Sequence, residues 1–184
     1  GLVWHGLSDG NITELDTRGN EPFEIRGDNF GPLVTDSAIR VTYGPAGTEL
    51  QARDCVLVEA HAAVMCVTAP GVGASHRWRI EVDGRSDLAP FAGGRTSYHA
   101  PVLHSVTGPG SVRASTRGGE VVYLTGDYFG FLGSAPTIGL RLVVRYGEHD
   151  GSDEASSPAL TYRAVACTVT EAHVLIRCET APGT

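Results

Sequence analysis

The stretch "EAHAAVMCVTAPG" at residues 59–71 returns at residues 171–183 as "EAHVLIRCETAPG". Both copies contain the same EAH tripeptide, a cysteine five residues later and the same TAPG ending. Three further blocks recur in the same order upstream of these stretches, so the chain is a tandem duplication. A repeat of this length restricts the fold class, because each copy has to form a comparable structural unit.

The recurring blocks define two units, predicted at residues 1–100 and 101–184, with the boundary near "YHAP" at residues 98–101. A period of about 100 residues is too long for a solenoid repeat and fits a small β-sandwich. The three upstream blocks are "LVWHGL" and "PVLHSV" (2–7 and 101–106), "TRGNEPFEIRGDNFG" and "TRGGEVVYLTGDYFG" (17–31 and 116–130, identical at 8 of 15 positions), and "RVTYG" and "VVRYG" (40–44 and 143–147).

Composition favours a globular all-β protein. Apolar residues make up 41% of the chain and charged residues 19%, and 24 glycines and 10 prolines stand singly between short apolar runs. Such a pattern is typical of short strands joined by tight turns, and no segment shows helical periodicity. Seven strands in the first unit predict an immunoglobulin-like sandwich. They are expected at residues 2–7, 23–26, 39–43, 55–58, 64–67 and 77–82, with a last one near Ser97.

The ordered blocks resemble the IPT/TIG family, the immunoglobulin-like domains shared by plexins, transcription factors and several surface proteins. The matching parts are "TRGGEVVYLTGDYFG", "VRYG", the cysteine hairpin ending in "TAPG", and the closing strand "WRIEVDGR" of the first copy. The first copy matches throughout, although Asn20 replaces the second glycine of the TRGG motif. The resemblance implies two tandem β-sandwiches, but it implies little about function because this fold has many roles.

The second copy matches the first only as far as "TAPGT". We therefore expect the second sandwich to lack its last strands, the counterparts of residues 77–82 and of the strand near Ser97. A small domain without these strands loses much of its core and keeps an unpaired strand edge. Two ways of completing it are expected: further polypeptide of the same chain, or a strand donated by a neighbouring chain. Repeated donation of this kind builds a filament.

The four cysteines occupy equivalent positions, Cys55 and Cys66 in the first copy and Cys167 and Cys178 in the second. Pairing within each copy gives a hairpin with a two-residue turn, at Ala60 and His61 in the first. Opposed residues of an antiparallel pair are close enough for a disulfide. An even count with one pair per repeat predicts two disulfides and an oxidising compartment.

A metal site is the alternative use of the same cysteines, with the spacing Cys-x5-His-x4-Cys and His61 or His173 as the third ligand. Zinc prefers four converging ligands, whereas here there are three and the histidine lies at a turn far from the cysteines. We therefore expect no metal and no cofactor. The acidic segment at 148–154 matches no calcium-loop spacing and is expected to be a solvated loop.

The sequon "NIT" makes Asn11 the predicted glycosylation site, carrying a covalent glycan in an exported eukaryotic protein. The tripeptide "RGD" at residues 26–28 suggests integrin binding, but the second copy has "TGD" in the same place. Gly27 and Asp28 are therefore interpreted as a turn that ends a strand.

Several function classes are disfavoured. The formal charge of −7 and the absence of Lys/Arg clusters argue against nucleic-acid binding. No apolar run reaches the roughly 20 residues of a membrane helix. No nucleophile elbow, phosphate loop or metal-binding histidine pair occurs, so no catalytic residue is predicted and we expect no enzymatic activity.

These features predict an extracellular or cell-surface protein with a structural or adhesive role. It is expected to bind protein partners, including copies of itself arranged head to tail in a surface fibre. Two alternatives remain open at this point. One is a ligand-binding or spacer fragment of a plexin-like receptor, and the other is a pair of accessory domains of a carbohydrate-active enzyme.

Overall fold

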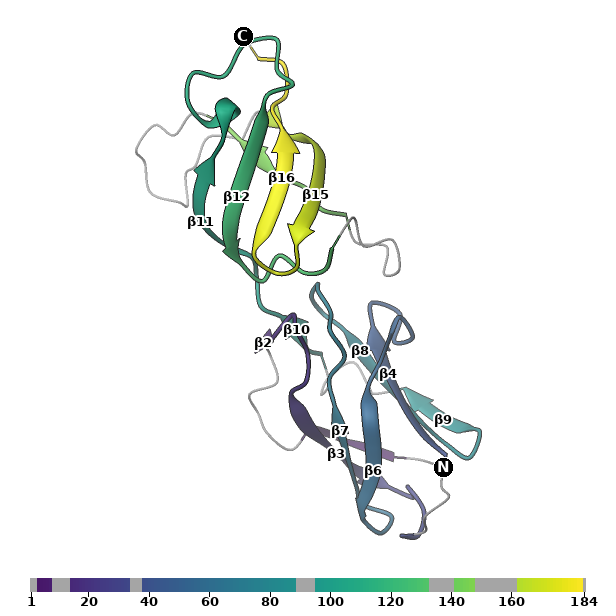
Figure 1. The fold of residues 1–184 in the computed structure, drawn as a ribbon. Coiled ribbons are helices and arrows are strands. Elements are labelled where there is room, and N and C mark those ends of the chain that lie inside the picture. The colour runs from purple at the N-terminus through teal and green to yellow at the C-terminus, as the bar shows by residue number, and fades with distance from the viewer. Residues whose placement is uncertain are drawn as a thin grey trace, which may run out of the picture. The chain divides into compact units, whose positions relative to one another are not determined.

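A computed structural model describes residues 3–7, 14–33, 38–88, 95–132, 141–147 and 162–183, without the side chains of 3–7 and 87–88. The predicted fold class is confirmed, because the described residues form antiparallel sheets, one parallel strand pair and a single 3-10 turn, Pro109–Ser111 (Figure 1). The chain divides into two compact units, Gly1–Ala100 and Pro101–Thr184. This division falls at the boundary between the two repeats.

The first unit is a sandwich of two four-stranded sheets. Its front sheet has the order β1-β3-β7-β6, and its back sheet has the order β5-β4-β8-β9. The front strands are β1 (Val3–Leu7), β3 (Pro22–Asp28), β7 (Ala63–Val67) and β6 (Arg53–Glu59). The back strands are β5 (Leu50–Gln51), β4 (Ile39–Gly44), β8 (Arg77–Val82) and β9 (Arg85–Leu88). A parallel pair joins β2 (Glu14–Leu15) to β10 (Ser97–Tyr98).

The core of the first unit follows from strand alternation. Strand β8 directs Trp78, Ile80 and Val82 inward, and all three are buried. The Trp78 ring stacks on Tyr43 of the neighbouring strand β4 with centroids 4.1 Å apart. It also contacts the Phe23 ring of the front sheet, with ring centroids 4.8 Å apart. The back sheet therefore contributes the largest side chains of this core, as alternation in "RWRIEV" predicts.

The second unit repeats the front sheet with the order β11-β12-β16-β15 (Figure 1). Even the irregularity is repeated, because the β11–β12 register shifts between Leu103 and Ser105 where the β1–β3 register shifts between Trp4 and Gly6. The strands are β11 (Val102–Thr107), β12 (Val121–Asp127), β16 (Leu175–Glu179) and β15 (Val165–Glu171). A separate pair joins β13 (Arg145–Tyr146) to β14 (Tyr162–Arg163).

Two of the repeated motifs form one clamp in each unit. The TRG turn lies against the TAPG segment, and the Gly71 amide donates to the Thr17 carbonyl at 3.1 Å. A side chain at Gly19 would meet the Ala69 backbone at 2.5 Å, and Gly19 has a φ of +68°. Glycine is required there because it alone tolerates both this backbone conformation and this approach. The second unit repeats the contact between Gly118 and the segment at 181–182.

The other two repeated motifs, EAH and FG, also contact each other. The His61 amide donates to the Gly31 carbonyl at 2.7 Å, and the Phe30 amide donates back to the His61 carbonyl at 3.2 Å. His173 makes the same pair of bonds with the turn at 129–130. Both histidines have a positive φ, 64° and 70°. The recurrence of these histidines is therefore explained by backbone geometry.

The two-residue turns predicted at Ala60 and His61 and at Ala172 and His173 are wrong. The first turn has three residues, 60–62, because Glu59 pairs with Ala63, and the second has three, 172–174, because Glu171 pairs with Leu175. The short strands β2, β5 and β9 were not predicted. Two-residue strands contain too few positions to show alternation, and "RSDL" in β9 is largely polar.

Candidate functional site

The structure joins Cys55 to Cys66 and Cys167 to Cys178, the pairs that the sequence predicts, with Cα atoms 4.1 Å apart in both. Cys66 and Cys178 are fully buried in the cores of their units. Because each sulfur is bonded to its partner cysteine, the zinc alternative is wrong. No group of three or more His, Cys, Asp or Glu that could hold a metal occurs within the described ranges.

Two other sequence features lie outside the described residues: the sequon at Asn11 and the acidic segment at 148–154. The RGD tripeptide is described, and its interpretation as a turn needs correction. Gly27 and Asp28 are the last residues of β3 and pair with β1, and the turn follows at Asn29, whose φ is 67°. Arg26 forms ion pairs with Glu24 and Glu59.

The back sheet of the second unit contains one short strand pair in the described part of the chain. Residues 141–147 alternate between exposed and half-buried side chains. Leu142, Val144 and Tyr146 pack against the core of this unit, whereas Val143 and Arg145 face solvent. The segment therefore has the alternation of a complete strand, although only its last residues are paired.

One edge of this segment has no neighbouring strand among the described residues. In the first unit, β4 lies between β5 and β8. In the second unit, β13 pairs with β14, the counterpart of β5, and the Ala164 amide donates to the Val144 carbonyl at 3.0 Å. Because backbone groups alternate in direction along a strand, the amides and carbonyls of Val143 and Arg145 point to the opposite edge. That edge is the position that β8 occupies in the first unit.

Apolar side chains beside this edge are less covered than their counterparts. Val41 and Tyr43 are 0% exposed in the first unit, whereas the equivalent Val144 and Tyr146 are only half-buried. On β11, Leu103 and Val106 are 54% and 46% exposed. They are opposite Gly126 and Leu124 of β12, which are both buried, so they face the interior of the unit. We call Leu103, Val106, Leu142, Val144 and Tyr146, with the edge at 141–146 that pairs with no strand in the described part of the chain, the open face.

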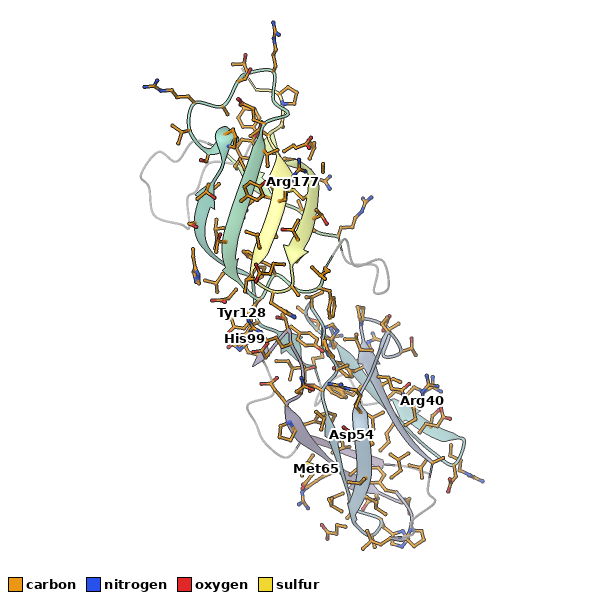
Figure 2. All side chains as sticks on the ribbon, viewed as in Figure 1. Arg40, Asp54, Met65, His99, Tyr128 and Arg177 are labelled. Atoms are coloured by element: carbon orange, nitrogen blue, oxygen red, sulfur yellow. A yellow bond between two sulfur atoms is a disulfide. The ribbon has the colours of Figure 1, made fainter. Side chains whose placement is uncertain are left out.

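A shallow polar hollow of about 190 Å³ lies on the first unit. Arg40, labelled on β4 in Figure 2, donates through Nε to the side-chain oxygen of Gln51 at 3.2 Å. Arg79 donates to the Ser86 hydroxyl at 2.7 Å. These acceptors are neutral, so they orient the guanidinium groups without neutralising them. The hollow is lined by Arg40, Thr42, Thr48, Arg79 and Glu81.

A second cluster lies inside the first unit, around His76. This side chain is fully buried, and neither ring nitrogen has a hydrogen-bond partner among the described residues. Its ring meets Tyr43 and Tyr98 edge to face, with centroids 6.1 and 5.4 Å away. The two tyrosine hydroxyls are 2.7 Å apart, and Tyr98 donates to the Ala69 carbonyl at 2.7 Å.

Burial dominates the protonation of this cluster. It lowers the pKa of His76, while the nearby carbonyls of Gly73 and Val72, which lie outside hydrogen-bonding geometry, raise it by less. Burial also raises the pKa of the Tyr43 and Tyr98 hydroxyls. All three side chains are therefore neutral at neutral pH, and the cluster is suited to packing rather than to proton transfer.

Comparison with known proteins adds little to this description. No protein-family model matches the chain, and no curated protein matches it. Among solved structures, the chain is similar to SGBP-B from a complex xyloglucan utilization locus in Bacteroides uniformis, with a TM-score of 0.38 and 15% sequence identity. The alignment covers 100% of this chain and 43% of that one, so the chain spans less than half of that protein. No described helix is long and apolar enough to cross a membrane.

Proposed function

We propose that this chain is an extracellular tandem of IPT/TIG-type sandwiches with a structural or adhesive role, whose second sandwich is completed by an added strand, either from further polypeptide of the same chain or from a protein partner. The observation that carries the proposal is the open face of the second unit. It combines backbone groups at one strand edge that pair with no described strand and partly exposed apolar side chains that face the interior of the same unit. An added strand satisfies both, since main-chain hydrogen bonds give affinity and alternate side chains fill the interior.

The two disulfides support the extracellular part of the proposal. Disulfides of this kind persist in oxidising compartments and are rare in the cytosol. Each one crosslinks the hairpin next to the clamp, so the front sheets are rigid supports. A strand that adds to the open face then meets a preformed surface, which lowers the entropic cost of binding.

Three donors of the strand fit this function: further polypeptide of the same chain, a neighbouring copy of the chain, which builds a head-to-tail filament, and a different surface protein. Hydrogen exchange tests the function without knowledge of the donor. In the recombinant chain of residues 1–184, the amides of Val143 and Arg145 should exchange rapidly. In protein isolated from its native surface, they should exchange slowly because a strand lies beside them. Rapid exchange in both samples would contradict the proposal.

A second function is favoured by the hollow at Arg40 and Arg79. Two guanidinium groups, two threonine hydroxyls and one carboxylate suit a polyol that carries a negative charge, such as an acidic sugar. This would make the first unit a carbohydrate-binding accessory domain. Affinity electrophoresis through gels of polygalacturonate and of neutral xyloglucan tests it. Retardation by the acidic polymer that is lost in the Arg40→Ala/Arg79→Ala variant supports this function, and equal mobility in both gels excludes it.

A further inference from the structure

We propose that the hollow on the first unit binds uronic-acid sugars and that Glu81 determines its specificity. Glu81 favours a ligand with one carboxylate flanked by free hydroxyls over a sulfated sugar. This inference rests on the carbohydrate-binding function proposed for the first unit and names the residue that selects the ligand at that site. It follows from the arrangement of charged side chains on the outward face of the back sheet.

The strand register places one carboxylate beside two guanidinium groups. Glu81 of β8 is directly opposite Arg40 of β4, and Arg79 precedes Glu81 by two positions on the same face of β8. These side chains point away from the core, because the intervening residues of β8 are buried. Neighbouring positions on one face of a sheet are roughly 5–7 Å apart. A single sugar ring can therefore contact more than one of these groups.

Neither arginine neutralises this carboxylate. Opposite charges that face each other across a strand pair usually attract, but Arg40 donates instead to Gln51 of β5 and Arg79 donates to Ser86 of β9. Glu81 forms no ion pair with any residue in the described part of the chain. Each guanidinium group keeps further N–H donors for a ligand, and the Glu81 oxygens remain available as acceptors.

The loop that borders the hollow is held in place by its own hydrogen bonds. The Glu49 carboxylate accepts from the amides of Ala46 and Thr48 at 2.9 and 3.0 Å. The Thr42 hydroxyl donates to the Gly47 carbonyl at 2.7 Å. These bonds fix the backbone that carries Thr48, whose side chain lines the hollow. A wall that is already ordered lowers the entropic cost of binding.

The arrangement is complementary to a carboxylate with hydroxyls next to it. A guanidinium group binds a carboxylate through two parallel N–H donors. An ionised glutamate only accepts hydrogen bonds, so a hydroxyl beside the carboxylate of the ligand can donate to Glu81. A sulfate ester in place of that hydroxyl has no proton to donate, and its negative charge is repelled by Glu81. Uronic acids with free hydroxyls therefore fit the hollow better than sulfated sugars.

The second unit replaces residues of this arrangement, so the hollow does not follow from the fold alone. Val143 stands in the place of Arg40, and Arg163 stands in the place of Gln51. The inward residues of the same strands are alike in the two units. The outward residues that line the hollow are therefore specific to the first unit.

Three oligosaccharides test the role of Glu81 on the full chain: a galacturonic acid oligomer, its neutral methyl ester, and the O-sulfated form of the acid. Calorimetry measures the affinity, and amide chemical shifts of the labelled chain locate the site. The acid should bind with shifts centred on Arg40, Arg79 and Glu81. The methyl ester should bind roughly tenfold more weakly because it loses charge-assisted hydrogen bonds. The sulfated form should bind roughly fivefold more weakly because of charge repulsion at an exposed site.

Glu81→Gln separates specificity from structure. It keeps the size of the side chain and one acceptor oxygen but removes the negative charge, so the preference for the acid over the sulfated form should fall from roughly fivefold to near equality. A merely structural role of Glu81 would lower both affinities together and leave their ratio unchanged. Asp54→Asn is the matched control, because it removes the same charge from β6 (Figure 2), and asparagine tolerates its φ of 52°. This control should keep the wild-type ratio.

Three results would overturn the inference: equal binding of the acid and its methyl ester, equal binding of the acid and its sulfated form, or a preference that persists in Glu81→Gln. In each case the carbohydrate-binding function stands if Arg40→Ala/Arg79→Ala still abolishes binding. If none of the three oligomers binds, or if this double variant binds them as the wild type does, both the function and the inference are wrong.

Discussion

The two units share a disulfide hairpin, a clamp and a front sheet, yet they differ in the back sheet that covers these parts. In the first unit a four-stranded back sheet lies over the front sheet, and Trp78 is fully buried between them. In the second unit the described back sheet has two short strands, and Leu103 stays 54% exposed. Three of the four repeated blocks therefore form the front half of the sandwich, and the units differ mainly in how completely the back sheet covers it.

The comparison separates the residues that hold the front half together from the residues that differ between the two back sheets. The TRG, FG, EAH and TAPG motifs contact one another within the front half, so they recur whether or not the back sheet is complete. In the back sheet, the inward Val41 and Tyr43 recur as Val144 and Tyr146, whereas the outward Arg40 and Thr42 are replaced by Val143 and Arg145. The second unit thus keeps the contacts of its front half and differs in the outward residues of its back sheet.

Removing the largest side chain from the core of the first unit should lower the stability of that unit, because less core is then buried, as in the second unit. We expect Trp78→Ala to lower the free energy of unfolding of the first unit by about 3–5 kcal/mol, since it deletes a fully buried aromatic side chain. Urea titration followed through the amide resonances of each unit measures the two transitions separately. The transition of the second unit should stay unchanged.

Trp78→Phe is the matched control, because it keeps an aromatic ring and should cost clearly less. Tryptophan fluorescence provides a second readout, because the two tryptophans, Trp4 and Trp78, both belong to the first unit. A loss below 1 kcal/mol in Trp78→Ala would show that the back sheet contributes little to stability.

Disulfide removal should affect both units alike. Each bond joins cysteines 11 positions apart, and a loop of this length stabilises by about 3 kcal/mol in the chain-entropy model. This effect acts on the unfolded chain, so it should not depend on how well the core is covered. We therefore expect Cys55→Ala/Cys66→Ala and Cys167→Ala/Cys178→Ala to lower the unfolding free energies of their own units by similar amounts. A much larger loss in one unit would show that the bond acts mainly through native packing.

The tyrosine hydroxyls test a finer difference between the units. Tyr98 donates to the Ala69 carbonyl in a buried cluster, whereas Tyr146 is half-buried and its bond to the Ala181 carbonyl is 3.3 Å long. We expect Tyr98→Phe to lower the free energy of unfolding by about 1–2 kcal/mol, because it removes a hydroxyl that bonds both the Tyr43 hydroxyl and the Ala69 carbonyl. Tyr146→Phe should cost less, because water can replace the hydroxyl. Equal losses in thermal unfolding would mean that the exposure of Tyr146 has no energetic consequence.

Mildly acidic pH should produce the smallest of these differences in stability between the two units. Burial lowers the pKa of His76, so the folded first unit binds fewer protons than the unfolded chain. Its stability is complete above the ordinary histidine pKa of about 6.5 and falls as the pH drops below that value. The melting temperature of the first unit should therefore decrease between about pH 6.5 and 5 relative to that of the second.

His76→Phe should remove this dependence. His61→Asn is the control, because His61 is exposed and asparagine tolerates its positive φ. A dependence that persists in His76→Phe would assign it to another group.

Much of the first sandwich and both disulfides could be predicted from the sequence. Strand β8 was expected at its observed bounds because "RWRIEV" alternates over six residues. The cysteine pairs followed from their equal spacing. The three-residue turn at His61 was missed, since nothing in the sequence of one hairpin shows that a histidine has a positive φ. The joint repetition of EAH and FG was the available signal.

The polar hollow and the contacts of the buried histidine could not be predicted for a different reason. Arg40 and Arg79 are far apart in the sequence, and only the β4–β8 register places them on neighbouring strands. His76 continues the inward alternation of Trp78, Ile80 and Val82, so the sequence could suggest its burial but not its contacts with Tyr43 and Tyr98. Both features depend on packing between distant segments, which a single sequence does not encode in any local pattern.

The disulfide hairpins also determine how the chain would respond to a pulling force. Each bond lies across one local hairpin and bypasses 11 chain positions. In the oxidised state these residues cannot extend, so each unit loses roughly 35–40 Å of contour length at 3.3–3.6 Å per residue. The residues outside the two disulfide loops can still unfold and extend. The disulfides therefore shorten the reach of an extended tether slightly and protect the tip of each front sheet, but they do not prevent mechanical unfolding.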